Sequence, residues 1–199
     1  MKLVLASNNA GKLAELQAMF ASLAVQLVPQ GNLGVPEADE PFRTFVENAL
    51  AKARNASQHS GLPAVADDAG LCVDAFSGLP GVDTAYYATQ FGYPKGDAWN
   101  VKALLEQMEM VGNRRAALVS TLVAVRSPED PEPLIAVGRV AGQITREPIG
   151  ENGFGFDPVM FIPAFNATFA QLPPEVKNAH SHRGQAAQQM VQMIRERWL

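Results

Sequence analysis

The sequence predicts an α/β protein of 199 residues, and two observations support that fold class. The chain opens with a strand–turn–helix–strand pattern over residues 3–28, in which an apolar run, helical spacing and strand-like alternation follow one another. No internal repeat, low-complexity tract or linker interrupts the remainder. We therefore expect a single domain over residues 1–199, comprising two lobes.

Each element follows from its local pattern. Residues 3–6 form an apolar run suited to a strand buried on both faces, and apolar residues recur at helical spacing from about Ala10. Thr44 followed by Glu47 fits a capping box and predicts a helix that ends near Gly61. The other predicted elements are a strand at 25–28, a loop at 29–41, strands at 64–66 and 71–75, an ordered loop at 76–97, a helix near 97–110, a β-hairpin of strands at 115–126 and 134–146, a glycine-rich loop at 150–157, a strand at 159–162 and a C-terminal helix from about Ser181.

Composition excludes several classes of protein. The formal charge of −4 argues against nonspecific binding to nucleic acids or to membrane surfaces, which requires clustered positive charge. Cys72 is the only cysteine, which excludes a disulfide scaffold, and its apolar surroundings indicate a buried strand thiol. No signal peptide and no apolar stretch of membrane-spanning length is visible, so we expect a cytoplasmic location.

The first candidate site is the segment between the first strand and the first helix. It comprises Ser7, Asn8, Asn9, Ala10, Gly11 and Lys12. A helix N-terminus with a nearby lysine suits a phosphate group, but the segment lacks the P-loop pattern. An ordinary N-cap beside a solvated lysine is the alternative.

The second candidate site is the Asp67-Asp68 pair, with Glu40 and Glu47 upstream. Adjacent strand residues point to opposite faces, so only one of the two aspartates easily enters a given cleft, and the other could cap the following turn. Carboxylates with spare oxygens suit Mg²⁺. Taken alone, however, such a pair is more often a solvated turn.

Two further clusters lie in the C-terminal third. Residues 150–158 flank two phenylalanines with glycines, which allows either ring stacking on a planar ligand or a turn whose aromatic rings belong to the core. Lys177 and the run 181–184 place cations near the start of the last helix, where they attract an anion or polar carbonyl groups, although Ser181 could be a plain N-cap. Together the four clusters indicate a Mg²⁺-dependent nucleotide enzyme.

The order and spacing of these motifs are similar to those of the inosine/xanthosine triphosphate pyrophosphatase family, nearly end to end. The matching segments are Ser7-x-Asn9-x-x-Lys12, Thr44-Phe45-x-Glu47-Asn48-Ala49 with Lys52-Ala53, Ala66-Asp67-Asp68-x-Gly70-Leu71, Pro80-Gly81, residues 153–158, Lys177 and Ser181-His182-Arg183-Gly184. The resemblance implies a long central mixed β-sheet that floors a cleft between two lobes, with helices packed around it. It also implies a homodimer that uses Mg²⁺ to convert ITP, dITP or XTP to the monophosphate and pyrophosphate.

Site roles follow from the same resemblance. It implies that Asp68 is the proton acceptor and a metal ligand and that Glu40 assists the metal. The implied substrate-binding residues are Ser7, Asn8, Asn9, Ala10, Gly11 and Lys12 at the phosphates, Lys52 and Ala69 near them, and Phe154, Gly155, Phe156, Asp157, Lys177, His182 and Arg183 at the base.

The sequence departs from the family pattern at three positions. Ala69 stands where Ser is common, Phe156 replaces a Tyr, and Tyr86 occupies the place of an Arg. Two alternatives stay open: a pyrophosphatase for other modified nucleotides, and a nucleotide-binding sensor without catalysis.

Overall fold

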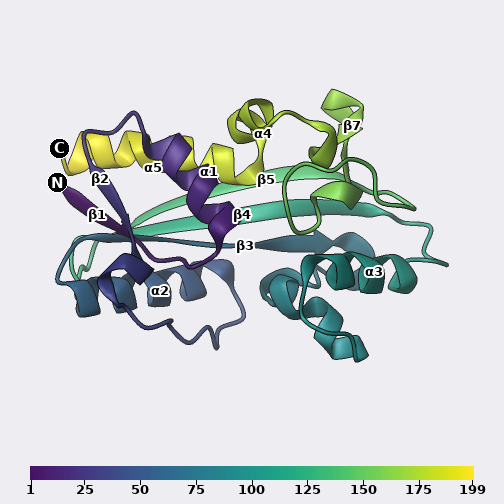
Figure 1. Ribbon diagram of the computed structural model, residues 1–199, viewed down its shortest axis with the longest axis horizontal. Helices are drawn as coiled ribbons and strands as arrows, with labels where there is room; N and C mark the ends of the chain where they lie inside the picture. The colour runs from purple at the N-terminus through teal and green to yellow at the C-terminus, as the bar shows by residue number, and fades with distance from the viewer. The chain divides into compact units, whose positions relative to one another are not determined.

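A computed structural model describes all residues 1–199, and it consists of one seven-stranded sheet with α-helices packed against it (Figure 1). The strands are β1 (Lys2–Leu5), β2 (Gln26–Pro29), β3 (Ala64–Val73), β4 (Arg115–Val125), β5 (Leu134–Ile144), β6 (Met160–Ile162) and β7 (Ala167–Thr168). The α-helices are α1 (Ala10–Phe20), α2 (Phe45–Ser60), α3 (Asp97–Gln107), α4 (Pro174–His180) and α5 (His182–Arg197).

The sheet mixes parallel and antiparallel pairs. Its strand order is β2-β1-β3-β4-β5-β6-β7. β1 pairs in parallel with β2 and β3, whereas β6 is antiparallel to both β5 and β7. The predicted α/β class with a mixed sheet is therefore confirmed.

The chain divides into two compact units, which are described separately. Unit 1 comprises Met1–Asp68, Ser120–Gly138 and His182–Leu199, and unit 2 comprises Ala69–Val119 and Arg139–Ser181. The long strands β3, β4 and β5 contribute residues to both units.

In unit 1, strand alternation assigns the helices to the two faces of the sheet. Val65 belongs to a core cluster with residues of α1 and α5, whereas Ala64 and Ala66 belong to a second cluster with α2. Figure 1 shows the same arrangement, with α1 and α5 over one face and α2 under the other. Any side chain of β3 in this unit therefore meets either α1 and α5 or α2, according to its parity.

The caps of the first two helices agree with the sequence. The Asn9 side chain accepts a hydrogen bond from the Lys12 backbone N–H and begins α1. Thr44 accepts a hydrogen bond from the Glu47 N–H at the start of α2, which ends at Gly61 with φ +68°. The predicted helix over this stretch is confirmed.

Unit 2 has its own apolar core, which helix α3 and a long 3₁₀ segment, Gly81–Phe91, help to cover. Leu104 of α3 and Tyr87 of the 3₁₀ segment are both buried in it. Phe156 and Phe169 come from the later part of the chain and fill the same cluster. Phe156 is 3% exposed, so its ring is part of the core.

The structure corrects three expectations and contains two elements that the sequence did not predict. Residues 64–66 and 71–75 are not two strands, because β3 runs unbroken from Ala64 to Val73. The Asp67-Asp68 pair consequently lies within a strand, and neither residue caps a turn. The expected loop at 76–97 contains the 3₁₀ segment, and both α4 and the short strand β7 were missed.

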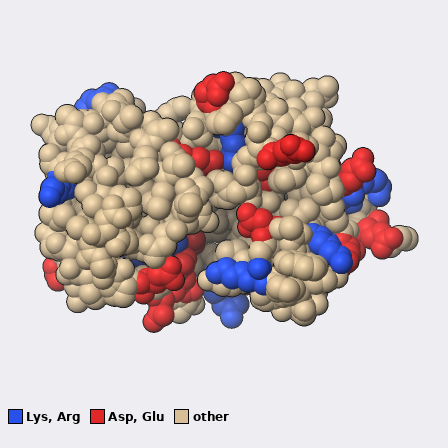
Figure 2. Space-filling model, in the orientation of Figure 1, with Lys and Arg blue, Asp and Glu red and all other residues tan.

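The charged side chains are interspersed on the surface. On the face seen in Figure 2, Lys and Arg side chains alternate with Asp and Glu and form no continuous basic band. No helix is both long enough and apolar enough to cross a lipid bilayer.

Candidate active site

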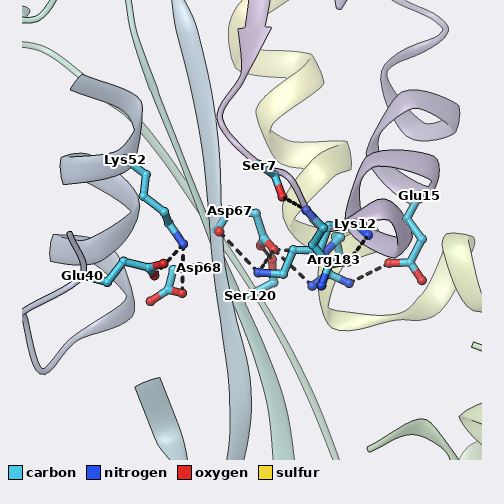
Figure 3. A network of polar contacts seen from close by, with 10 residues as sticks. Ser7, Lys12, Glu15, Glu40, Lys52, Asp67, Asp68, Ser120 and Arg183 are labelled. Carbon is cyan, nitrogen blue, oxygen red and sulfur yellow. Dashed lines mark hydrogen bonds and ion pairs between the residues drawn. The ribbon is translucent and has the colours of Figure 1, made fainter. Parts of the chain in front are cut away.

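The two adjacent aspartates of β3 lie on opposite faces of the sheet in unit 1 (Figure 3). Asp67 has the parity of Val65 and points toward α1 and α5, whereas Asp68 has the parity of Ala66 and points toward α2. The two carboxylates therefore stand in separate polar surroundings. Both residues are buried, with exposures of 1% for Asp67 and 5% for Asp68.

Asp68 shares a lysine with Glu40. The Lys52 Nζ of α2 lies 3.2 Å from Asp68 Oδ1 and 2.8 Å from Glu40 Oε2. The second carboxylate oxygen, Asp68 Oδ2, is buried and has no hydrogen-bond partner. Burial raises the pKa of Asp68 above its usual value, and Lys52 and Lys12 offset this only in part. Asp68 thus carries a spare oxygen and a heightened proton affinity.

Asp67 is the acceptor for three side chains. Its Oδ2 lies 2.9 Å from Lys12 Nζ and 3.1 Å from Arg183 Nη2, and its Oδ1 accepts a hydrogen bond of 2.5 Å from Ser120 Oγ. Burial alone would raise the pKa of Asp67, but Arg183, Lys12 and Ser120 together hold it far below its usual range. Asp67 is therefore a fixed negative charge at any physiological pH.

Arg183 extends this network into α5. It is 3% exposed, and its Nη1 lies 2.6 Å from Glu15 Oε2 of α1. Gly138 of β5 allows the first turn of α5 to lie directly on the strand, because a Cβ there would stand 1.9 Å from the His182 carbonyl oxygen. The position of Arg183 thus depends on a close backbone approach as well as on two carboxylates.

The segment before α1 is a polar turn at a helix N-terminus. Ser7 Oγ accepts a hydrogen bond of 3.2 Å from the Asn9 N–H, and Asn8 donates one of 2.9 Å to Glu37. Such a terminus presents unpaired N–H groups and a partial positive charge to an anion. Ala10 and Gly11 form the first turn of α1 here. The loop and the Lys12 ammonium together have the chemistry of a phosphate site.

A second polar cluster lies in unit 2 around Asp157. Lys177 Nζ is 2.5 Å from Asp157 Oδ2 and 4.8 Å from the centre of the Phe154 ring. The same carboxylate oxygen accepts a hydrogen bond of 2.9 Å from the Phe154 N–H, and Asp97 at the start of α3 accepts one of 2.8 Å from the Gly155 N–H. The loop that carries Phe154 is thus fastened by two carboxylates.

A family model described as the Ham1 family matches residues 3–193 of this chain. The chain belongs to the Ham1 family. The resemblance inferred from the motifs is confirmed, since full-length relatives carry the name expected of that family. A protein of Acidovorax sp. (strain JS42) and one of Paracidovorax citrulli (strain AAC00-1), both named dITP/XTP pyrophosphatase, are each 76% identical over 198 residues. The alignments cover 100% of this chain and 97% and 100% of those proteins, respectively.

A solved structure shares the fold. The HAM1 protein from Coxiella burnetii is 42% identical and superposes with a TM-score of 0.90, and the match covers 98% of this chain and 99% of that one. The Ham1 fold assigned to the present chain therefore rests on both sequence and structural similarity.

Within this Ham1 chain, sequence reasoning brought together only part of each polar cluster. In unit 1 the predicted residues Ser7, Asn9 and Lys12 share one segment, and Lys52 of α2 contacts both Glu40 and Asp68. Glu15 and Ser120 were missed, because neither lies in a recognisable motif. In unit 2, Asp97 was missed for the same reason. Ala69, a predicted substrate-binding residue, directly follows Asp68 in the sequence and is half-buried.

The Asp68 and Glu40 carboxylates of unit 1 are suitable ligands for a divalent cation such as Mg²⁺. Asp68 Oδ2 is a buried oxygen without a partner, and the Glu40 carboxylate reaches the same lysine. No group of three or more His, Cys, Asp or Glu side chains forms a complete metal cage. Mg²⁺ is typically held by one or two carboxylates together with waters and substrate phosphates, which matches this donor set.

Proposed function

We propose that the protein hydrolyses non-canonical purine nucleoside triphosphates (ITP, dITP and XTP) to the monophosphate and pyrophosphate, and so removes them from the nucleotide pool. Support comes from the relatives named dITP/XTP pyrophosphatase, which are 76% identical over the full chain. It is a hydrolase that acts on phosphoric anhydrides. The observation that carries the mechanism is the buried, partnerless Oδ2 of Asp68.

Asp68 is the proton acceptor in this proposal. A carboxylate whose pKa is raised by burial holds a proton more tightly than an exposed one, and this favours general-base chemistry near neutral pH. Asp68 takes a proton from a water molecule, the water oxygen bonds to the α-phosphorus, and the bond to the bridging oxygen of pyrophosphate breaks. Lys52 stays within 3.2 Å of Asp68 Oδ1 and fixes the orientation of the carboxylate.

The phosphate end is bound by the segment from Ser7 to Lys12. The N–H groups of the first turn of α1 and the Lys12 ammonium offset the negative charge of the leaving pyrophosphate. Ser7 and Asn9 shape the turn, since their side-chain oxygens accept hydrogen bonds from its backbone. Lysine and helix N-terminus act on any triphosphate, whatever its base.

The base is read by the residues that the family resemblance implies. Phe154 stacks on the purine, and its Lys177 neighbour, the Asp157 carboxylate and the pair His182 and Arg183 supply hydrogen-bonding groups. Donors satisfy a 6-oxo group but meet another donor in the 6-amino group of adenine, so a buried polar group loses its partner. Discrimination between ITP and ATP follows from that difference.

Mg²⁺ is the proposed cofactor, with Asp68 and Glu40 as its protein ligands. When bound, the cation supplies positive charge that stabilises the developing charge on the phosphate oxygens. Lys52 donates hydrogen bonds to both carboxylates and so holds them close together before a cation binds. We also propose a homodimer, as the resemblance implies, and a cytoplasmic location, which suits the free thiol of Cys72.

One assay tests the function. Pyrophosphate release is measured with ITP, dITP, XTP, GTP, ATP and dUTP, each with Mg²⁺ and with EDTA, for the wild type and for Asp68→Asn. We expect Mg²⁺-dependent release that favours the 6-oxo purines ITP, dITP and XTP, and its loss in the variant. Preference for dUTP would move the substrate class to pyrimidines. Binding of ITP without any pyrophosphate release would make the protein a sensor.

A further inference from the structure

Asp67 is a buried charge of unit 1 to which the proposed reaction assigns no role. Its side chain lies on the face of β3 opposite to that of Asp68, the proposed general base, so it cannot accept a proton in place of Asp68. Its side chain is fully buried, yet its carboxylate is the meeting point of Lys12, Arg183 and Ser120. A buried carboxylate with this many partners calls for an explanation beyond packing.

The two cations that meet at Asp67 come from different helices. Lys12 belongs to α1 and Arg183 to α5, and both lie within about 3 Å of the same oxygen, at 2.9 and 3.1 Å for the nearest nitrogens. Two like charges this close repel each other strongly in a buried setting. Without a negative charge between them, at least one side chain would have to turn away.

Lys12 and Arg183 differ in how far they depend on Asp67. Arg183 retains Glu15 as a second carboxylate partner, whereas the side-chain contacts of Lys12 both involve Asp67, one to the carboxylate and one of 3.5 Å to the backbone carbonyl oxygen. Ser120 Oγ holds the other carboxylate oxygen, so the plane of the carboxylate is fixed from β4. The network is therefore rigid at its centre, and its centre is Asp67.

We propose that Asp67 is a positioning residue for the reaction, which fixes the phosphate-binding Lys12 and the base-reading Arg183 relative to each other. This inference rests on the proposed function, since it takes the roles of those two cations from there. In this role Asp67 acts through the two cations and not on the substrate itself. It sets the spacing between the charge that meets the phosphates and the charge that meets the base, so both ends of the nucleotide depend on it.

The test is steady-state kinetics of Asp67→Asn with ITP. The amide keeps the shape of the side chain and removes its charge. A purely structural role would lower the fraction of active molecules and thus the apparent kcat, but it would leave KM unchanged, because KM does not depend on enzyme concentration. A positioning role raises KM. We expect KM for ITP to rise about tenfold. This lies within the loss of activity, up to about 100-fold, that a misplacement of about 1 Å can cause.

Two competitive inhibitors separate the ends of the substrate. Inorganic tripolyphosphate probes the phosphate end and inosine probes the base end. We expect both inhibition constants to rise in Asp67→Asn. A rise in only one would overturn the claim that Asp67 links the two ends, and an unchanged KM for ITP would overturn the positioning role itself.

Asp130→Asn is the matched control. Asp130 is also a buried aspartate of unit 1, 3% exposed, but it caps the β4–β5 turn by accepting hydrogen bonds from the Arg126 and Glu132 N–H groups. We expect lower stability and an unchanged KM. An equal rise in KM in this control would refute a specific role for Asp67.

A milder variant keeps the proposal testable if Asp67→Asn does not fold. Ser120→Ala removes one hydrogen bond and keeps the charge, and we expect KM for ITP to rise about two- to threefold; no change would count against the proposal. The proposed function fails separately, through a wild type that releases no pyrophosphate from ITP. An active wild type with an unaffected Asp67→Asn variant refutes this inference alone.

Discussion

Replacing Gly138 by alanine tests whether the close approach of β5 and α5 positions Arg183. A Cβ at residue 138 would stand 1.9 Å from the His182 carbonyl oxygen and 2.8 Å from the Ala186 nitrogen. Both of these atoms are backbone, so no side-chain rotation relieves the overlap. The first turn of α5 has to move away from the strand, and it carries His182 and Arg183 with it.

The size of the effect follows from the overlap. The nearest contact is 1.1 Å short of the 3.0 Å below which Cβ atoms are essentially not found. Overpacking of this kind costs about 1–3 kcal/mol of unfolding free energy. For a chain of this length that corresponds to a Tm lower by roughly 2–12 °C. A displacement of about 1 Å at Arg183 predicts a loss of kcat/KM for ITP of about 100-fold.

The assay combines urea denaturation with pyrophosphate release from ITP. Gly112→Ala is the matched control, because a Cβ at residue 112 meets no heavy atom within 4 Å. The control should change stability by less than about 0.5 kcal/mol and leave kcat/KM unaltered. If Gly138→Ala is as stable and as active as the wild type, the close approach does not position α5, and the reasoning about Arg183 is wrong.

Three other predictions concern single side chains. Asp68→Asn should fold with a wild-type Tm and lose about 10²–10⁴-fold in kcat, since it cannot accept the proton; retained activity would exclude Asp68 as the base. Phe154→Ala should raise KM for ITP about 10- to 100-fold through lost stacking and leave inhibition by tripolyphosphate unchanged, and equal losses for both would contradict a base-stacking role. Burial raises the pKa of the Cys72 thiol above its usual value, although Arg139 opposes this, so the thiolate forms late as pH rises. The midpoint of iodoacetamide alkylation against pH should lie above that of free cysteine measured in parallel, and an equal or lower midpoint would disprove the shift.

Periodicity predicted the elements whose apolar pattern is continuous, and it failed where tertiary contacts decide. β3 was expected as two strands, because Asp67-Asp68 followed by Ala69-Gly70 has the composition of a turn. Burial of the two aspartates is stabilised by Lys12, Lys52 and Arg183, whose distances along the chain no local window covers. Helix α4 was missed because Pro173 and Pro174 look like breakers, although proline also begins helices.

The candidate site was predicted by motif and completed by structure. Ser7, Asn9 and Lys12 could be found because a loop before a helix has a recognisable phosphate chemistry. Glu15, Ser120 and Asp97 could not, since each is an isolated polar residue that gains meaning only from its partner. The partner of Glu15 is 168 residues away in sequence. Long-range pairing of this kind leaves no signal in a single sequence.

The two faces of β3 impose a constraint on how this protein can change in length. Because side chains alternate along the strand, one residue added or removed between Val65 and Asp67 would turn the carboxylate now beside Arg183 toward α2, and its neighbour toward α1. Both charges would then be buried opposite the wrong partners. We expect single-residue insertions to be tolerated in the turn at residues 126–133 but not within this strand. Odd and even positions of β3 therefore cannot be exchanged without burying each carboxylate on the wrong face of the sheet.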